Sequence, residues 1–284
     1  MEVRSLLTGN RCVSLPFSDY CNPLSGNGIG QSETISKVLE YGSASGWNTL
    51  ELRLLDTPFE RKSESSGMYY HHVLDLSPGE DRLFSSFRES TRRNIRKAAK
   101  EGVVLTVSDT LSDTAAFYRL NCLTRRRHGL PPQPYRFFRN LHKFMISRGD
   151  GIVVLAYHDA VPIAGAVFLH VGRKSYFKYG ASDKKFQNLR ANNLVMWEAI
   201  RWYAAREYAT MCFGRNEEWN DNLRRYKNAW GTVESEIRYY NYDFGDRRFV
   251  RKKSNIKGIH NAVFRSLPLP ISRFIGSTLY RHMA

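Results

Sequence analysis

Five segments between Arg173 and Phe244 decide the fold: RKSYFKYGASD (173–183), ANNLVMWEAIRW (191–202), FGRNEEW (213–219), LRRYKNAWG (223–231) and ESEIRYYNYDF (234–244). The first segment alternates as a strand that ends in Lys-Tyr-Gly, and the second has the apolar spacing of a helix. The third predicts a strand that ends in Phe-Gly-Arg, and a short basic helix then runs into Trp-Gly. Aromatic and cationic side chains therefore fall at the ends of neighbouring strands, where open α/β sheets bind their ligands.

The rest of the chain mixes strand-like and helix-like patterns in no regular order. Apolar residues at helical spacing predict helices, and period-two alternation predicts strands. The expected helices are Gln31–Ser43, Thr91–Lys100, Leu111–Arg126, Tyr135–Ser147 and Asn192–Glu207, and the main expected strands are Thr49–Leu54, Tyr69–Leu76, Val103–Val107, Ile152–Tyr157, Ala164–Val171, Ser175–Tyr179, Thr210–Phe213 and Val233–Tyr242. This order predicts an α/β fold on a mixed sheet rather than a regular doubly wound one.

The charge and the cysteines restrict the partners and the compartment. Forty-three basic against 27 acidic residues give a net charge of +16 over 284 residues. Such a charge favours polyanions (RNA, nucleotide phosphates or an anionic membrane surface), although a charge spread over the surface for solubility gives the same total. The four cysteines form no CxxC pair, no His stands at zinc spacing from them, and so no metal site is expected. We therefore expect a reduced, cytoplasmic protein with Cys122 and Cys212 in its core.

Targeting signals are not evident in the sequence. The first residues lack the apolar stretch of a secretory signal, and no run approaches the roughly 20 apolar residues of a membrane span.

Two basic segments are candidate surfaces for phosphate. The expected helix at Thr91–Lys100 carries five charges in the nine residues from 92 to 100, and Arg92 and Arg96 share one face. It is the best candidate for RNA or lipid phosphate, and the alternative is a solvated helix face. Residues 246–284 join a basic run to apolar residues at helical spacing, among them Ile256, Ile259, Val263, Ile271 and Phe274. Such a tail is either a helix that faces a membrane surface or a phosphate, or a C-terminal helix docked on the body.

The order and spacing of several motifs resemble the FemAB-like branch of the GNAT acyltransferase superfamily. These motifs are STRRNIRKAAKEGVVL (90–105), TRRRHGLPPQPYRFF (124–138), KYGASD (178–183), NNLVMWEAI (192–200), FGR (213–215) and RRYKNAWG (224–231). The closing LPLPISRFIGSTL (267–279) resembles the subgroup associated with exosortase and PEP-CTERM exopolysaccharide systems. The resemblance runs from about Ser14 to the C-terminus.

The resemblance implies two GNAT-like subdomains, each a twisted mixed sheet flanked by helices. It places a first subdomain, incomplete at its N-terminus, at residues 1–108, a second at 109–245, and the basic tail at 246–284. The best-known relatives transfer an amino acid from aminoacyl-tRNA to an amine of a peptidoglycan precursor. The implied partners are therefore a tRNA and a lipid-linked or nucleotide-linked cell-envelope precursor, met in the cytoplasm or at the inner face of the membrane. No bound cofactor is implied, because the donor is a co-substrate.

One departure from the family pattern bears on the donor. The GNAT pyrophosphate loop reads Q/R-x-x-G-x-G/A ahead of a helix, whereas KKFQNLRANN (184–193) contains no glycine. Backbone amides approach a pyrophosphate closely only where residues are small. This disfavours acetyl-CoA in the usual GNAT cradle and favours a tRNA-type or other donor. Two alternatives stay open: an acyl-CoA-dependent N-acetyltransferase acting on an amino sugar, and a non-catalytic module that binds RNA or anionic membrane.

Three residues are candidates for the chemistry. Acyl transfer to an amine needs positioned reactants, an acceptor for the amine proton and donors to the oxyanion. We expect direct transfer, since no Ser-His-Asp or Cys-His arrangement is recognisable in the sequence. Lys227 matches the family's aromatic-lysine pair, which implies contact with a phosphate; the alternative is a surface lysine. Tyr179 is a candidate general acid or orienting hydroxyl, or simply a packed ring. His128 is a candidate base, or a complement to the helix C-terminus.

The remaining candidates bind substrate or phosphate. They are Lys178, Arg215, Tyr226, Asn193, Arg125, Arg92 and Arg96. Arg215 could instead pair with Glu217 or Glu218. Asn192 and Asn193 are expected to cap their helix, and Asn193 is also a candidate donor to a substrate carbonyl.

Overall fold

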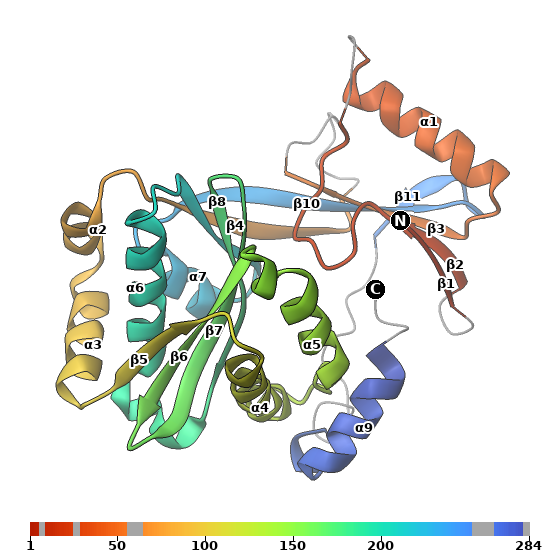
Figure 1. The fold of residues 1–284 in the computed structure, drawn as a ribbon. Helices are drawn as coiled ribbons and strands as arrows, with labels where there is room; N and C mark the ends of the chain where they lie inside the picture. The colour runs from red at the N-terminus through yellow and green to blue at the C-terminus, as the bar shows by residue number, and fades with distance from the viewer. Residues whose placement is uncertain (6–8, 25–28, 56–64, 252–263, 281–284) are drawn as a thin grey trace.

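One mixed sheet runs through the computed structural model, which describes residues 1–284 except 6–8, 25–28, 56–64, 252–263 and 281–284 (Figure 1). Its described strands are β1 (Glu2–Ser5), β2 (Gly9–Val13), β3 (Thr49–Leu54), β4 (Gly67–Asp75), β5 (Val104–Ser108), β6 (Gly151–His158), β7 (Val161–Val171), β8 (Lys174–Ser182), β9 (Thr210–Glu217), β10 (Val233–Asp243) and β11 (Arg248–Val250). They lie in the order β1-β2-β3-β10-β4-β9-β8-β7-β6-β5, with β11 paired to β10. Only the β2–β3 and β8–β9 pairs are parallel within the described residues. The predicted α/β fold on a mixed sheet is confirmed.

Helices cover both faces of the β5–β8 half of the sheet. On one face lie α2 (Glu80–Ser86), α3 (Glu89–Lys100) and α6 (Ala191–Ala204), and on the other lie α4 (Leu111–Arg127) and α5 (Tyr135–Phe144) (Figure 1). The remaining described helices are α1 (Gln31–Ala44), α7 (Asp221–Asn228), α9 (Leu269–Leu279) and the short 3-10 segments η2 (Ile146–Arg148) and η3 (Lys184–Leu189).

The two helical layers explain the sequence of the central strands. Ile152–Ala156 in β6 and Ile163–Phe168 in β7 are apolar without interruption, because both faces of these strands are buried. Alternate residues enter two separate cores, one under α3 and α6 and one under α4 and α5. Trp230 is fully buried in the first core, where replacement by alanine would cost about 3–5 kcal/mol.

A third core lies at the other end of the sheet. There α1 packs on β3 and β10 through Ile35, Leu50 and Tyr240. The sheet continues across the boundary expected between residues 108 and 109, since β5 pairs with β6 and β4 pairs with both β9 and β10. The division into subdomains at that boundary stays a prediction.

Two strands run further than the sequence predicted. β8 continues past Tyr179 to Ser182, and β9 continues past Phe213 to Glu217. Each contains a β-bulge where an end was expected. Lys178 is the extra residue on β8 between the pairs formed with Val167 and Phe168, and Phe213–Gly214 lie opposite a single residue on β4. A bulge interrupts the alternation of a strand just as a strand end does, so the sequence pattern predicts ends where the structure has bulges.

The C-terminal helix α9 docks on α4. Arg273 Nε donates to the hydroxyl of Tyr118 at 3.2 Å, and Ser272 and Gly276 are buried in the contact. This is one of the two alternatives expected for the tail. Ile271 and Phe274 remain exposed on the other side of α9.

The expectations about the tail and about membrane spans can be compared with the structure only for the described residues. Ile256, Ile259 and Val263, which were expected in the amphipathic tail, lie outside them. Within the part of the chain that the structure describes, no helix is both long and apolar enough to cross a membrane.

Candidate active site

The two parallel neighbours β8 and β9 part at their carboxyl ends. They pair at only three positions, from Lys174–Tyr176 on β8 to Thr210–Cys212 on β9. Beyond this point each strand has its bulge, and Gly214 takes a φ of 72° that favours glycine. The bulges bend the strands and end their pairing. The carboxyl ends of neighbouring parallel strands are where open sheets bind ligands.

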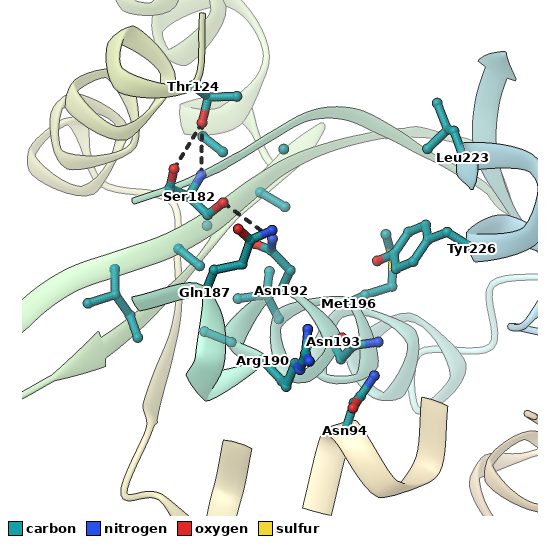
Figure 2. Close-up of a pocket in the computed structure, with 18 of the residues that line it drawn as sticks. Asn94, Thr124, Ser182, Gln187, Arg190, Asn192, Asn193, Met196, Leu223 and Tyr226 are labelled. Atoms are coloured by element: carbon teal, nitrogen blue, oxygen red, sulfur yellow. Dashed lines mark hydrogen bonds between the residues drawn. The ribbon is translucent and has the colours of Figure 1, made fainter. Parts of the chain in front are cut away.

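A cleft of about 600 Å³ lies at this place, on the side of α3 and α6. Its walls are the end of β8, the start of α6, one side of α7 and the first half of α3. Figure 2 shows Ser182 on one side of the cleft, Tyr226 and Leu223 on the other, and Asn94 and Asn193 along its edge. Four arginines line it: Arg88, Arg127, Arg190 and Arg225. The cleft therefore suits an extended, anionic ligand.

The start of α6 corrects the predicted cap. The residue at the N-cap is Arg190, with a φ of 59°, while Asn192 and Asn193 lie inside the first turn. The prediction that the two asparagines cap the helix was wrong, because the left-handed residue that begins the helix comes earlier. Arg190 adopts a backbone conformation usually left to glycine, at a cost of about 1–2 kcal/mol. The loop without glycine thus still turns into the helix, and it brings a guanidinium to the cleft (Figure 2).

A buried threonine satisfies the backbone at the end of β8. The Thr124 hydroxyl accepts from Ser182 N at 2.9 Å and donates to Ser182 O at 3.2 Å, while Asn192 Nδ2 donates to Ser182 Oγ at 3.3 Å (Figure 2). Both backbone groups of Ser182 are therefore engaged by a side chain. A ligand cannot add to this position as an extra strand without displacing Thr124.

Lys227 lies at the point where the strands part. Its ammonium donates to the carbonyl oxygen of Gly214 at 2.7 Å, and the residue is only 3% exposed. Burial lowers the pKa of Lys227 to about 8, against the opposing influence of the Asp19 carboxylate. The alternative of a surface lysine is excluded. The ammonium is thus held, buried, at the bulge between the two parted strands, next to the cleft but outside its lining.

A loop near the N-terminus packs on the face of the sheet opposite the cleft. Lys178, the bulged residue of β8, donates to Phe17 O at 3.1 Å, and Tyr239 donates its hydroxyl to Asp19 O at 2.7 Å. The Asp19 side chain lies beside Gly214, since a Cβ there would be 3.3 Å from Asp19 Oδ2. A carboxylate and two ammonium groups thus gather around the two bulges.

Arg215 packs against two tyrosines that also contact each other, rather than pairing with a glutamate. Its guanidinium carbon is 4.0 Å from the ring centre of Tyr69 and 4.8 Å from that of Tyr239. The described residues show no ion pair between Arg215 and Glu217 or Glu218. Arg215 is therefore a cation fixed by aromatic contacts, and within the described residues it forms no ion pair.

His71 and Cys212 form a buried contact that the sequence did not indicate as part of a site. His71 Nε2 lies 3.0 Å from Cys212 Sγ across the β4–β9 pair. Burial lowers the pKa of His71 to about 4 and raises the pKa of Cys212 to about 11, so both groups are neutral at pH 7. A nucleophilic cysteine acts as a thiolate. At pH 7 the pair therefore holds a thiol and a neutral imidazole rather than a thiolate.

Tyr179 and Arg125 lie on the α4–α5 side. Tyr179 packs edge-on against Phe137 and Phe138, and burial raises its pKa so that the hydroxyl stays protonated. Arg125 Nε donates to Pro131 O at 3.2 Å, and its neighbours include Tyr179 and Tyr280.

The remaining predicted residues divide between the cleft and the outer surface. His128, Asn193 and Tyr226 line the cleft, and burial raises the pKa of Tyr226 to about 12. Arg92 and Arg96 line neither the cleft nor the bulges; Arg96 covers the ring of Phe84 at 5.4 Å. Their proposed role in phosphate binding stays a prediction.

The comparison with protein families identifies the fold. Residues 85–228 match the model described as an acetyltransferase (GNAT) domain, which is half of the chain. The chain belongs to this GNAT family. The matched residues of the GNAT domain contain β8, β9 and the helices that wall the cleft, so the predicted membership of the superfamily is confirmed.

Curated relatives of the GNAT protein include lipid II:glycine glycyltransferases. That of Staphylococcus haemolyticus is 27% identical over 103 residues, covering 34% of this chain and 25% of the relative. That of Staphylococcus aureus is 19% identical over 236 residues, covering 58% and 56%. The chain thus spans between a quarter and just over half of the length of these relatives.

Solved structures share the fold at low identity. FemX superposes with a TM-score of 0.57 at 16% identity, covering 73% of this chain and 75% of FemX. L-PGS from Bacillus licheniformis superposes with a TM-score of 0.50 at 10% identity, covering 94% and 82%. These likenesses concern the fold alone, and they agree with the predicted GNAT-like architecture.

Proposed function

We propose that this GNAT protein is a FemAB-type N-acyltransferase, which moves an aminoacyl group from aminoacyl-tRNA to an amine of a lipid-linked peptidoglycan precursor. The observation that carries the proposal is the parting of β8 and β9, with an arginine-lined cleft on one side and the buried Lys227 ammonium held at the bulge of β9. The acceptor class is supported by the relatives named lipid II:glycine glycyltransferase.

In the proposed reaction, the acceptor amine attacks the ester carbonyl carbon of the donor. A carbon–nitrogen bond forms, the carbon–oxygen bond to the terminal ribose breaks, and the ribose oxygen leaves with a proton. The amine nitrogen loses one proton in the same step. No oxidant, reductant or further co-reactant is required.

The proposed role of Lys227 follows from its position. Its ammonium would donate to the oxyanion that forms when the carbonyl is attacked, because it is already fixed at the bulge by Gly214 O. A pKa of about 8 lets the same group exchange a proton near neutral pH. Arg215 and Lys178, on the side opposite the cleft, are proposed to bind anionic groups of the acceptor.

Two features of the cleft support aminoacyl-tRNA over acyl-CoA. Thr124 already occupies both backbone groups of Ser182, which closes that part of the free strand edge to an amide-bearing arm. Arg190 stands where a compact pyrophosphate loop would need glycine. Four arginines along the cleft suit the phosphates and the 3′ end of an RNA.

An alternative acceptor and the cellular location are proposed from the sequence alone. An exopolysaccharide precursor remains an acceptor to be tested, because the closing segment resembles the PEP-CTERM-associated subgroup. A place in the cytoplasm, in peripheral contact with an anionic inner membrane face, agrees with the charge of +16.

A donor screen tests the proposed function. The protein is incubated with lipid II, or with an amino-sugar acceptor, and with either a radiolabelled mixture of aminoacyl-tRNAs or labelled acetyl-CoA. The proposal expects label on the lipid II amine from aminoacyl-tRNA, and its loss in Lys227→Ala. Transfer only from acetyl-CoA would instead establish an N-acetyltransferase that acts on the amino sugar or on another acceptor. No transfer from either donor would leave the non-catalytic binding module.

A further inference from the structure

A second, smaller pocket adjoins the cleft at the end of α4. Its volume is about 330 Å³, and it shares Arg127, Ser182 and Asp183 with the cleft. Four cationic side chains line it: Arg126 and Arg127 from the end of α4, Lys184 from the start of η3, and Arg265. We call it the basic pocket.

The cations of the basic pocket are not neutralised by the protein. None of the four forms an ion pair with a residue that the structure describes. Asp183 is the acidic residue in the lining, and its carboxylate accepts from Lys185 N at 3.0 Å as the cap of η3. The pocket therefore holds four positive charges against one carboxylate.

These cations are not needed to satisfy the end of α4 either. The carbonyl oxygens of Thr124, Arg126 and Arg125 accept from the backbone amides of His128, Gly129 and Leu130, respectively, at 2.9–3.1 Å. A helix C-terminus closed by its own backbone leaves the guanidinium groups beyond it free to bind something else.

The pKa of His128, at the border of the cleft, is affected by the positive charges of this region. Burial lowers its pKa, and Arg127, Arg125 and Arg265 lower it further. Cations concentrated in a concave site attract an anion more strongly than the same charges spread over a surface.

We propose that the basic pocket binds a phosphate group of the acyl donor beyond the part that enters the cleft. The proposal rests on the proposed function, because it assigns the pocket to the donor of that reaction. The shared wall of Arg127, Ser182 and Asp183 makes the pocket a continuation of the cleft, so one ligand can occupy both. The phosphate is either a phosphodiester of RNA or a phosphate of a coenzyme thioester.

Binding measurements with two probes separate these sources. A fluorescently labelled RNA hairpin with a single-stranded 3′ end is titrated by anisotropy, and coenzyme A by calorimetry, both in 50 mM salt. The test variant is Arg126→Glu/Lys184→Glu. The matched control is Arg136→Glu/Arg139→Glu, which makes the same charge change at exposed positions of α5.

The expected result is a loss of affinity confined to the test variant. We expect a loss of more than about tenfold for the donor-type probe, a salt slope shallower by about one to two, and little change in the control. A loss for RNA assigns the phosphodiester, and a loss for coenzyme A alone assigns the coenzyme phosphate. An Arg126→Gln/Lys184→Gln variant, checked by its melting temperature, guards against misfolding and should lose affinity in the same direction.

Two outcomes would overturn the proposal. One is an equal loss in the test and control variants, which would make the effect one of net charge. The other is that neither probe binds the wild-type protein. Failure of the proposed function is a different result: RNA binding that depends on the pocket would persist while no aminoacyl transfer is seen. Conversely, if the test variant is active and its KM for the donor is unchanged, the proposed role of the basic pocket is refuted and the proposed function is not.

Discussion

Replacing Lys227 by methionine should stabilise the folded protein at neutral pH while it abolishes transfer. The pKa of Lys227 falls from 10.5 to about 8 on folding, mainly through burial. A difference of one pKa unit corresponds to about 1.4 kcal/mol, so burial of the ammonium disfavours the folded state by about 3 kcal/mol. Methionine has a similar length and removes this penalty, but it leaves Gly214 O without its donor, which costs about 1–2 kcal/mol. The net gain at pH 7 is then about 1–2 kcal/mol.

The pH dependence gives this prediction its sharpest test. Between pH 8 and 10.5 the unfolded chain holds the Lys227 proton more tightly than the folded chain does. The penalty is therefore complete below the folded pKa of about 8 and disappears as the pH rises through 10.5. The advantage of Lys227→Met should be present at pH 7 and should shrink toward pH 10.5.

Thermal denaturation of both proteins from pH 7 to pH 10.5 measures the effect. For a chain of 284 residues, a gain of 1–2 kcal/mol raises the melting temperature by about 2–3 °C. Lys178→Met, which removes a partly exposed ammonium from the neighbouring bulge, is the matched control and should show no such gain. A Lys227→Met protein that is less stable than wild type at pH 7, or whose difference from wild type does not change with pH, would refute the reasoning.

Three further changes probe the same framework. Stability should fall as the pH drops from 6.5 to 4, because the unfolded chain protonates His71 before the folded protein does; His71→Gln should flatten that part of the melting profile, and an unaltered slope would count against the buried neutral imidazole. Thr124→Val should lower the free energy of unfolding, measured in urea, by about 1–3 kcal/mol, because it leaves the backbone N–H and C=O of Ser182 without their hydrogen-bond partner. A decrease below about 0.5 kcal/mol would show that water replaces the hydroxyl. Gly276→Ala should loosen α9, because a Cβ there overlaps the carbonyl oxygen of Pro132; hydrogen exchange should quicken in α9 but not in the Ser277→Ala control, and equal exchange in both would mean that the helix shifts without loss of docking.

Local sequence patterns were sufficient for most of the secondary structure. The apolar runs of β6 and β7 and the amphipathic pattern of α3 are set by burial of whole faces, so they can be read from spacing. The bulges of β8 and β9 could not be predicted from spacing, because an extra residue and a strand end interrupt the alternation in the same way. The cap of α6 was also missed, since Arg190 adopts a conformation that its side chain gives no reason to expect.

The candidate site depends on contacts between distant segments. Lys227, Lys178 and Arg215 were selected from the motifs around them, but nothing near Asp19 or His71 in the sequence indicates that these residues lie beside them. His71 meets Cys212 across 141 residues, and only the β4–β9 pairing brings them together. The burial that lowers the pKa of Lys227 is likewise a property of the assembled site.

The sequence by itself determined the class of fold, the family and the residue types at the strand ends, because these follow from periodicity and from motifs carried within short segments. Only the tertiary structure decided where those residues act. The parting of β8 and β9, the cleft on one side and the buried ammonium at the bulge arise from strand pairing and from the packing of α7 and the N-terminal loop against the sheet. Such pairings join segments far apart in the chain, and their free energy depends on the whole sheet rather than on any local pattern.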